Sequence, residues 1–363
     1  MEISKYFQNC IDEGKLTGAA YVIWREDKEL SRGVVGYSDL ARTKSLQENA
    51  IFRLASMTKP ITATAVMILC ERDLLNLDNP IGKYIPFAHS GVGEFVNGKI
   101  RFVGYAREIT IRDCLSHSSG LGSGELGSYQ FYQRKQPFNL EENVRSWNGA
   151  FLDFEPRTRQ AYSGLVAFEL LALVAEKVSG MPFAEFLRSE IFEPLGMTQT
   201  KYTLTKEEEN CLVDMTKTGE LGNLEKVDFG LRGFDAFAEG YSGGSAGLFS
   251  TLDDYSRFVK MLACKGVWNG KRILQDRSVE RMRSSEISID DWQDWGLGVR
   301  VIKKQDNVQP LSIGSFGWSG AYGTHFWVEP QTGISAVLML NKADVGGSNS
   351  VFSREFERLV YKN

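Results

Sequence analysis

Strand-like patterns lie at both ends of this chain, whereas helical patterns fill its middle. Runs rich in Val, Ile, Tyr, Phe and Trp that fit strands occur at residues 18–27, 28–39, 296–304, 323–330 and 333–342. Helical spacing of apolar residues flanks these runs at residues 3–11 and 352–361. Strands from the two ends can pair with one another only if the ends meet in space. The pattern therefore predicts an α+β fold, in which one antiparallel sheet built from both chain ends is flanked by helices and carries an inserted, mainly helical lobe.

The middle of the chain supplies helix signals with recognisable ends. Apolar residues recur at helical spacing over residues 56–75, and Pro60 is tolerated because it falls in the first turn. Residues 163–180 are apolar nearly all round, which predicts a buried helix that closes at its last glycine. Residues 205–228 are polar and predict an exposed loop or a small hairpin. We expect a sheet domain of residues 1–55 and 237–363, a helical domain of residues 56–236, and an active site in the cleft between them.

Charge, hydropathy and cysteine content narrow the function classes. The 363 residues carry a formal net charge of −4, which argues against a nucleic-acid binder. The apolar stretch 61–69 is far shorter than the roughly 20 residues that span a bilayer. The amino terminus shows no apolar secretory segment, so we expect a cytoplasmic protein without a membrane span. The 5 cysteines form no CxxC pair and the 3 histidines lack metal-ligand spacing, so we expect reduced thiols and no metal site.

The first candidate for chemistry is an SxxK sequence, Ser56 to Lys59, at the start of a predicted helix. Residues three apart share a helix face, so the Lys59 ammonium can reach the Ser56 hydroxyl. The backbone N–H of Ser56 is an orphan donor of the first turn, available to a developing oxyanion. A capping serine with a solvated lysine would have the same local sequence. Context must therefore decide between a nucleophile and a structural serine.

That context comes from further segments in a fixed order: residues 52–69 around the SxxK, LSHSSGL at 115–121, QAYSG at 160–164, EPLGM at 193–197, GGSAGLFSTLDDYSRF at 243–258 and GWSGAYGTHFWVEP at 317–330. Together, in this order, they resemble the serine β-lactamase-like superfamily, which includes class C β-lactamases, penicillin-binding D-alanyl-D-alanine peptidases and family VIII carboxylesterases. The resemblance extends from about residue 18 to about residue 341. It implies a β-lactamase/transpeptidase-like fold and catalysis through a serine acyl-enzyme.

The resemblance also implies roles for three side chains. Ser56 is the nucleophile that becomes acylated, and Lys59 lowers the cost of removing its proton. Tyr162 matches the tyrosine of the second motif, whose phenolic oxygen shuttles a proton between nucleophile and leaving group. Either Lys59 or Tyr162 can be the formal base. No cofactor is implied.

Two departures from the family pattern bear on the substrate. The second motif usually reads Tyr-x-Asn, but Gly164 stands in place of the amide that would hold the acylamino group of a penicillin or peptide. The third motif, usually Lys-Thr-Gly or His-x-Gly, reads Trp318-Ser319-Gly320, and tryptophan cannot pair with a substrate carboxylate. This tryptophan resembles family VIII carboxylesterases and related acyltransferases of polyketide tailoring. In either case the backbone N–H of Ala321 would be the second oxyanion donor.

Two other motifs compete for these roles. Lys217-Thr218-Gly219 is a literal KTG, but it lies in a polar segment and precedes the GLFST segment that it should follow. Ser245 lies in a G-x-S-x-G sequence, and Asp290 and His325 follow in the order of an α/β-hydrolase triad. The chain lacks the repeated βαβ units of that fold, so we favour Ser56.

Histidine and aromatic residues complete the candidates. We expect His117 to be structural near the cleft, and His325 to reach the cleft or face solvent. Aromatic residues that either roof the cleft, as an apolar acyl or alcohol pocket, or belong to the core are Tyr105, Tyr129, Phe131, Tyr132, Trp147 and Phe151.

The sequence thus predicts a serine hydrolase that cleaves small-molecule carboxylic esters through an acyl-enzyme on Ser56. The nearest alternative is an acyltransferase that uses the same acyl-enzyme, and weak β-lactamase or D-alanyl peptidase activity is a further one. A binding or sensor module that is acylated without turnover is the alternative from another class. No nucleic-acid partner is expected.

Overall fold

The structure is a computed structural model that describes residues 2–131, 139–227, 241–306, 310–347 and 349–362. The helices are α1 Glu2–Asp12, α2 Thr58–Glu71, α3 Ile111–Leu115, α4 Gly124–Phe131, α5 Leu140–Arg145, α6 Val166–Ser179, α7 Phe183–Leu187, α8 Glu193–Leu195, α9 Lys206–Glu209, α10 Leu252–Ala263, α11 Asp276–Met282 and α12 Val351–Val360, with short 3₁₀ or π turns η1 Ala55–Met57, η2 Ile81–Lys83 and η3 Arg188–Phe192. The strands are β1 Gly18–Arg25, β2 Lys28–Gly36, β3 Ile51–Arg53, β4 Val92–Val96, β5 Lys99–Gly104, β6 Thr216–Thr218, β7 Leu224–Lys226, β8 Phe249–Thr251, β9 Val267–Trp268, β10 Lys271–Arg272, β11 Ile287–Ser288, β12 Gln293–Trp295, β13 Arg300–Ile302, β14 Phe316–Ser319, β15 His325–Glu329 and β16 Ile334–Met339.

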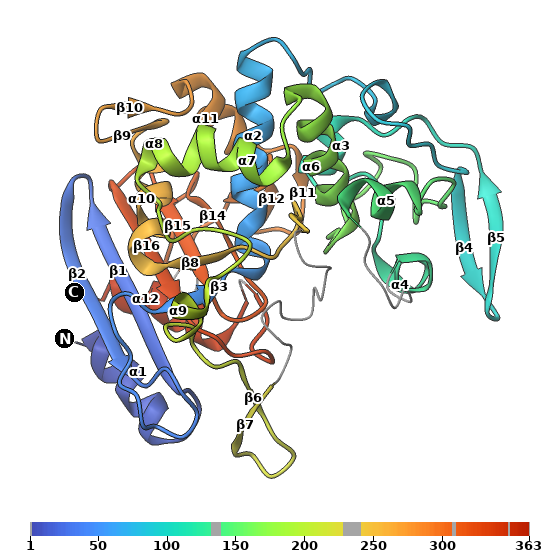
Figure 1. The fold of residues 1–363 in the computed structure, drawn as a ribbon. Helices are drawn as coiled ribbons and strands as arrows, with labels where there is room; N and C mark the ends of the chain where they lie inside the picture. Colours follow the sequence, from blue (N-terminus) through green and yellow to red (C-terminus); the bar gives the residue numbers. More distant parts are fainter. Residues whose placement is uncertain (1, 132–138, 228–240, 307–309, 348, 363) are drawn as a thin grey trace.

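The predicted α+β architecture, with one antiparallel sheet from both chain ends, is confirmed. Its strands run in the order β11-β12-β13-β14-β15-β16-β1-β2, and each neighbouring pair is antiparallel. The last strand, β16, pairs with the first, β1, with Trp24 opposite Ser335. Both termini therefore lie on the same side of the molecule (Figure 1).

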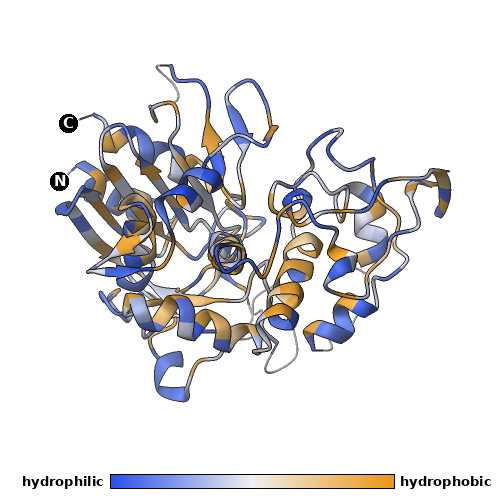
Figure 2. Cartoon of the chain, turned by 90° about the horizontal axis from the view of Figure 1, so that it is seen from above, coloured by the Kyte–Doolittle hydropathy of each residue, from blue (hydrophilic) through white to orange (hydrophobic). Residues whose placement is uncertain are grey.

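Alternating side chains of β1 face two different apolar layers. Tyr21 and Ile23 pack with α1 and α12, where Phe7 and Phe356 are fully buried. Val22 belongs to the larger core on the other face of the sheet, to which α2 and α10 contribute. Successive side chains of a strand point to opposite faces of the sheet. A strand that is covered on both faces is therefore apolar at nearly every position, and its sequence is a continuous apolar run. Hydrophobic residues concentrate in these inner elements, and hydrophilic residues dominate the peripheral loops (Figure 2).

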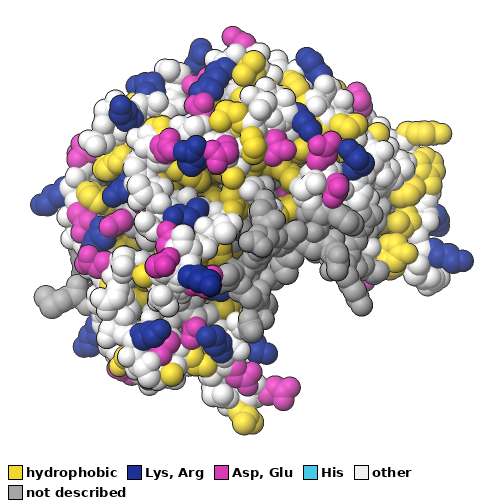
Figure 3. Space-filling view, viewed as in Figure 1, with side chains coloured by type: hydrophobic (Ala, Val, Ile, Leu, Met, Phe, Trp, Pro, Cys, Tyr) yellow, Lys and Arg dark blue, Asp and Glu magenta, His cyan; other side chains and the backbone are white. Residues whose placement is uncertain are grey.

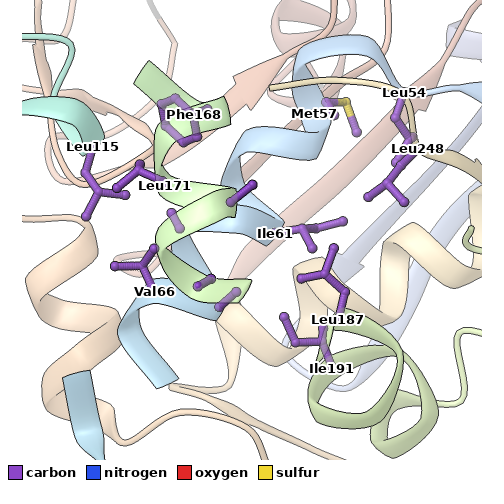
Figure 4. Close-up of a cluster of buried hydrophobic side chains, with 14 of the residues drawn as sticks. Leu54, Met57, Ile61, Val66, Leu115, Phe168, Leu171, Leu187, Ile191 and Leu248 are labelled. Atoms are coloured by element: carbon purple, nitrogen blue, oxygen red, sulfur yellow. The ribbon is translucent and has the colours of Figure 1, made fainter. Parts of the chain in front are cut away.

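The helical part of the fold is built around α2 and α6, which pack side by side. Their apolar side chains meet in one cluster with residues of α3 and η3, as Figure 4 shows for Ile61, Val66 and Phe168. Burial of an aromatic side chain such as Phe168 stabilises a fold by roughly 1.5–3 kcal/mol. Gly180 ends α6 with φ of +71°, a left-handed conformation that glycine adopts without strain. The predicted helix over 163–180 is thus present, although it begins at Val166.

Segments outside these layers show where the sequence patterns were less informative. The polar stretch 205–227 forms the β6–β7 hairpin, as one of the two expected alternatives, but also the short helix α9. The division into two domains stays a prediction, because its boundary at residues 236 and 237 falls outside the described residues. In the part of the chain that the structure describes, no helix has the length and apolar character needed to cross a membrane.

The β4–β5 hairpin projects from the helical part and exposes apolar side chains. Phe102, Val103 and Tyr105 are 48%, 57% and 92% exposed, and hydrophobic atoms cover this hairpin in the space-filling view (Figure 3). Tyr105 therefore does not line an enclosed pocket. Phe131 and Trp147 are buried in the core with ring centroids 5.7 Å apart, so for them the core alternative is correct. Tyr132 lies outside the described residues.

Candidate active site

Ser56 lies in the 3₁₀ turn η1, between strand β3 and helix α2. The preceding residue, Ala55, has φ of +47°, a conformation that costs a residue with a side chain roughly 1–2 kcal/mol. Contacts on both sides hold this turn in place. The Thr324 hydroxyl donates to the carbonyl of Leu54 at 3.0 Å, and the Tyr255 hydroxyl donates to the carbonyl of Met57 at 2.9 Å. The strained turn places Ser56 at the amino end of α2, with its side chain nearly buried.

Lys59 is completely buried one helical turn after Ser56. Its Nζ donates to Ser56 Oγ at 3.2 Å, to the carbonyl oxygen of Gly164 at 2.7 Å and to the carbonyl oxygen of Ser245 at 2.9 Å. These three acceptors match the three donors of an ammonium group. Gly164 occupies the position at which the family pattern has asparagine, so a backbone carbonyl contacts the lysine there.

Tyr162 completes the hydrogen bonding of Ser56. Its hydroxyl donates to Ser56 Oγ at 2.8 Å, and the Lys59 Nζ lies 5.2 Å from the centre of its ring. The Tyr162 ring contacts the ring of His117, and the two ring centroids lie 4.6 Å apart. Trp295 stacks on the Tyr162 ring with a centroid distance of 5.9 Å and an interplanar angle of 14°. The predicted set of Ser56, Lys59 and Tyr162 is therefore brought together, with the serine oxygen between the other two groups.

His117 supports Tyr162 from the protein interior. Burial, and then the charge of Lys59, lower the pKa of His117 well below its usual range, so its imidazole is neutral. The ring Nδ1 accepts a hydrogen bond from the backbone N–H of Ser163 at 3.1 Å. The backbone carbonyl of His117 accepts a hydrogen bond from the backbone N–H of Ala161 at 2.9 Å. His117 thus fixes the backbone on both sides of Tyr162, in agreement with the structural role expected for it.

The third motif lies at the end of β14, next to the Ser56 turn. Trp318 faces Tyr162 and Trp295, with ring centroids 5.4 and 4.6 Å away. Gly320 packs so tightly that an added Cβ would lie 2.3 Å from the carbonyl oxygen of Leu54. The glycine therefore permits a close approach to this turn, and the next residue, Ala321, packs against the buried cluster that contains Ala55.

Ser319 points to the opposite face of the sheet from Trp318. Its Oγ lies 2.6 Å from Nδ1 of His325, and Nε2 of that histidine lies 3.0 Å from Glu357 on α12. Arg300 donates to the same carboxylate at 3.2 Å, and all four side chains are buried. His325 therefore neither lines the cleft nor faces solvent, which corrects both alternatives considered for it. It connects the third motif to the last helix.

Neutralising Glu357 should reveal this buried network in a pH-dependent way. Burial opposes ionisation of Glu357, but the hydrogen bond from His325 and the charge of Arg300 outweigh it and hold the pKa below its usual value. A lowered pKa contributes stability above the unfolded-state value, about 4.3, and that contribution is lost as the pH falls through the folded-state value. We expect Glu357→Gln to lower the free energy of unfolding by about 3 kcal/mol at neutral pH, and by less at about pH 4. Urea unfolding at both pH values measures this difference.

The control for that experiment is Glu355→Gln on the solvent side of the same helix. Glu355 pairs with Arg358 at the surface, where an ion pair contributes about 0–1 kcal/mol. A loss for Glu357→Gln that is independent of pH would show that packing, and not the charge of the network, carries its contribution.

Two residues at this site could not be singled out from the motifs. Trp295 is one, because nothing in its sequence context marks it as a partner of Tyr162. Glu169 is the other: it is fully buried in α6, and it accepts hydrogen bonds from Ser245 and Tyr241. Burial raises the pKa of Glu169, whereas these hydrogen bonds and the charge of Lys59 act in the opposite direction. A carboxylate within the otherwise apolar run of residues 165–175 was an available signal, because such residues are rarely buried without a partner.

The competing motifs do not assemble an active site. Ser245 is fully buried and its Oγ donates to Glu169 at 2.5 Å, while His325 contacts Ser319 and Glu357. Asp290 is exposed and accepts from the backbone of the adjacent turn. The KTG of residues 217–219 lies at the exposed end of the β6–β7 hairpin. Among the described residues, no group of three or more His, Cys, Asp or Glu could hold a metal ion.

Comparisons with known proteins place this geometry in context. The family model described as Beta-lactamase matches residues 3–351. Esterase EstB from Burkholderia gladioli is 28% identical over 371 residues, which cover 94% of this chain and 90% of EstB. The solved structure of EstCE1, described as a hydrolase with promiscuous acyltransferase activity, has a TM-score of 0.81 at 25% identity, over 98% of this chain and 96% of that one. Simvastatin synthase from Aspergillus terreus has a TM-score of 0.79 at 18% identity, over 100% of this chain and 98% of that one, and shows the fold alone.

Proposed function

Because this chain belongs to the β-lactamase family, we propose that it is a serine hydrolase that cleaves carboxylic esters through an acyl-enzyme on Ser56. One observation carries the proposal. Ser56 Oγ lies within hydrogen-bonding distance of two proton-transfer groups at once, Lys59 Nζ at 3.2 Å and the Tyr162 hydroxyl at 2.8 Å. The likeness to esterase EstB and to the hydrolase EstCE1 supports ester hydrolysis or acyl transfer.

The proposed reaction proceeds in two halves. Ser56 Oγ attacks the ester carbonyl carbon while its proton passes to the Lys59 and Tyr162 pair. The backbone N–H groups of Ser56 and Ala321 stabilise the oxyanion, as the close packing of Gly320 on Leu54 favours. Tyr162 then protonates the leaving alcohol as the C–O bond breaks. Water attacks the acyl-enzyme in the second half and returns the acid and free Ser56.

The walls of the site favour a neutral substrate over a β-lactam or a peptide. Trp318, with its ring 4.6 Å from that of Trp295, stands where the family pattern has a cation. A substrate carboxylate at that place would lose water without gaining an ion pair, which costs several kcal/mol. Gly164 supplies no side-chain amide. We therefore propose uncharged acyl esters as substrates, bound against the aromatic side chains of Tyr162, Trp295 and Trp318.

Acyl transfer is the second candidate. The same acyl-enzyme can be resolved by an alcohol or an amine in place of water, and EstCE1, which shares this fold, is a hydrolase with promiscuous acyltransferase activity. A second acceptor needs only access to the acylated Ser56. The ratio of transfer product to free acid in the presence of an added alcohol distinguishes the two reactions.

The test of the proposal is a direct comparison of substrates with the wild-type protein. We expect steady turnover of a short-chain p-nitrophenyl ester and at least about 100-fold lower kcat/KM for a chromogenic cephalosporin, which corresponds to the loss of about one ionic contact. Fast cephalosporin cleavage would contradict the role given to Trp318. A single stoichiometric burst of nitrophenol, with the adduct on Ser56 persisting in the mass spectrum, would identify an acylated sensor instead of an enzyme.

A further inference from the structure

A buried carboxylate lies on the far side of Ser245 from Lys59. The backbone N–H and the Oγ of Ser245 donate to Oε1 of Glu169 at 3.1 and 2.5 Å. The carbonyl oxygen of the same residue accepts from Lys59 Nζ at 2.9 Å. One residue therefore connects the acidic group to the basic group, and both charged side chains have no exposed surface.

The hydrogen-bond partners of Glu169 fit a carboxylate. A backbone N–H can only donate, and Ser245 donates to the carboxyl group through its backbone. The Tyr241 hydroxyl oxygen accepts from Nδ2 of Asn143 at 2.9 Å, which leaves its own hydrogen for Oε2 of Glu169 at 2.8 Å. A carboxylate can accept all three of these bonds through its two oxygens.

The hydrogen-bond partners of Lys59 fit an ammonium group. Two of its three partners, the carbonyl oxygens of Gly164 and Ser245, can only accept. The third partner, Ser56 Oγ, already accepts from Tyr162. An ammonium group can donate to all three of these partners at once.

Among the described residues, the other titratable groups that face this pair are uncharged. Burial, and then the charge of Glu169, raise the pKa values of Tyr241 and Tyr202 above the usual range for tyrosine. His117, on the Tyr162 side, is neutral for the reasons given above. Tyr162 contributes a phenol hydroxyl. Glu169 is therefore the negatively charged partner that faces Lys59 within the part of the chain that the structure describes.

We propose that Glu169 is the counter-ion of Lys59 and sets the pH above which Ser56 can be activated, an inference that rests on the proposed function. At rest, Lys59 is an ammonium group and Tyr162 is a phenol. Neither group can accept the proton of Ser56 until the pair has lost one proton. The pair must lose that proton before Ser56 Oγ can bond to the acyl carbon. A neighbouring negative charge favours the protonated pair, so it raises the pH of this loss.

Ser245 makes this coupling specific to the site. Three successive backbone carbonyls of this segment accept hydrogen bonds from side chains. Gly243 accepts from the Tyr202 hydroxyl at 2.6 Å, and Gly244 accepts from the Thr62 hydroxyl at 2.7 Å. Ser245 accepts from Lys59 Nζ at 2.9 Å. An added Cβ on Gly243 would lie 2.7 Å from Oε1 of Glu169. The glycine-rich segment is thus explained by its close approach to the carboxylate, and not by a nucleophile elbow.

The decisive variant is Glu169→Gln, which removes the charge and keeps the shape. We expect the acid limb of the kcat/KM profile for ester hydrolysis to move to lower pH by on the order of one unit. The matched control is Asp254→Asn on α10. Asp254 is also buried and also accepts from a backbone N–H and a hydroxyl, those of Gln199 and Thr200, but it does not contact the site. Its acid limb should coincide with that of the wild type.

A second variant covers the case in which Glu169→Gln does not fold. Ser245→Gly keeps the backbone contacts to Glu169 and Lys59 but removes the hydroxyl donor that lowers the pKa of Glu169. Glu169 is then neutral up to a higher pH, so the acid limb should move in the same direction by less. Near-UV circular dichroism shows whether each variant is folded. If both variants are folded and the acid limbs of their kcat/KM profiles equal that of the wild type, Glu169 is not the counter-ion.

The rate at which an alkyl fluorophosphonate labels Ser56 gives the same information without ester turnover, since the new P–O bond replaces P–F and the serine proton must still leave. A pH dependence of labelling that shifts in Glu169→Gln supports the inference even for a protein that turns over no ester. If the wild type turns over esters and the pH dependence of Glu169→Gln equals that of the wild type, the inference is overturned and the proposed function stays intact. A protein whose Ser56 is neither labelled nor acylated at any pH contradicts both.

Discussion

Ser56→Ala is expected to lower kcat/KM for ester hydrolysis at least about 10⁴-fold, because the acyl-enzyme cannot form without the nucleophile. Alanine removes the oxygen on which Lys59 and Tyr162 converge, and water cannot occupy its position with the same geometry. The variant should fold, since the turn is held through the backbone carbonyls of Leu54 and Met57. The measurement is p-nitrophenyl ester hydrolysis, together with fluorophosphonate labelling followed by mass spectrometry.

The comparison variant is Ser245→Ala, which tests the other serine with a hydrolase-like sequence. Ser245 donates to Glu169 and is fully buried, so its substitution should shift the pH profile and lower activity by a much smaller factor than Ser56→Ala. Fluorophosphonate should still label Ser56 in this variant. Retained activity in Ser56→Ala together with lost activity in Ser245→Ala would reverse the assignment of the nucleophile.

The parts of the fold that follow from local periodicity were predictable from the sequence. The strand runs at both ends could be placed because alternation of side chains is a property of consecutive residues. The same holds for the helical segment of η1 and α2, although the predicted single helix from Ser56 is a 3₁₀ turn followed by an α-helix that begins at Thr58. A spacing of three residues is enough to bring Lys59 to the serine. The position of Tyr162 followed from the order of motifs, and its hydroxyl lies 2.8 Å from Ser56 Oγ across 106 residues of sequence separation.

The parts that depend on the pairing register of strands were not predictable in the same way. Ser319 lies opposite His325 in the β14–β15 pair, so both side chains point to the face of the sheet away from Trp318. A shift of one residue in this register would have turned His325 toward the cleft, and composition does not decide between the two. Glu357 then completes the network from a helix at the other end of the chain, which no local pattern indicates.

Tyr162→Phe is expected to lower kcat/KM for alkyl esters by roughly 10²–10⁴, the usual contribution of a positioned proton-transfer group. Phenylalanine keeps the stacking on Trp295 and the contact with His117, so the change is confined to the hydroxyl that donates to Ser56 Oγ. The matched control is Tyr84→Phe, which removes a hydroxyl bonded to Asn76 and Asn79 and should leave the kinetics unchanged.

The leaving group provides the sharper test of what the Tyr162 hydroxyl does. An alkoxide leaves only if it is protonated, whereas p-nitrophenolate is stable enough to leave without a proton. If Tyr162 protonates the leaving alcohol, Tyr162→Phe should lose at least about ten times more activity on an ethyl ester than on a p-nitrophenyl ester with the same acyl group. Equal losses on the two esters would restrict Tyr162 to the attack of Ser56 and leave Lys59, through its hydrogen bond to the serine oxygen, as the group that returns the proton to the alcohol.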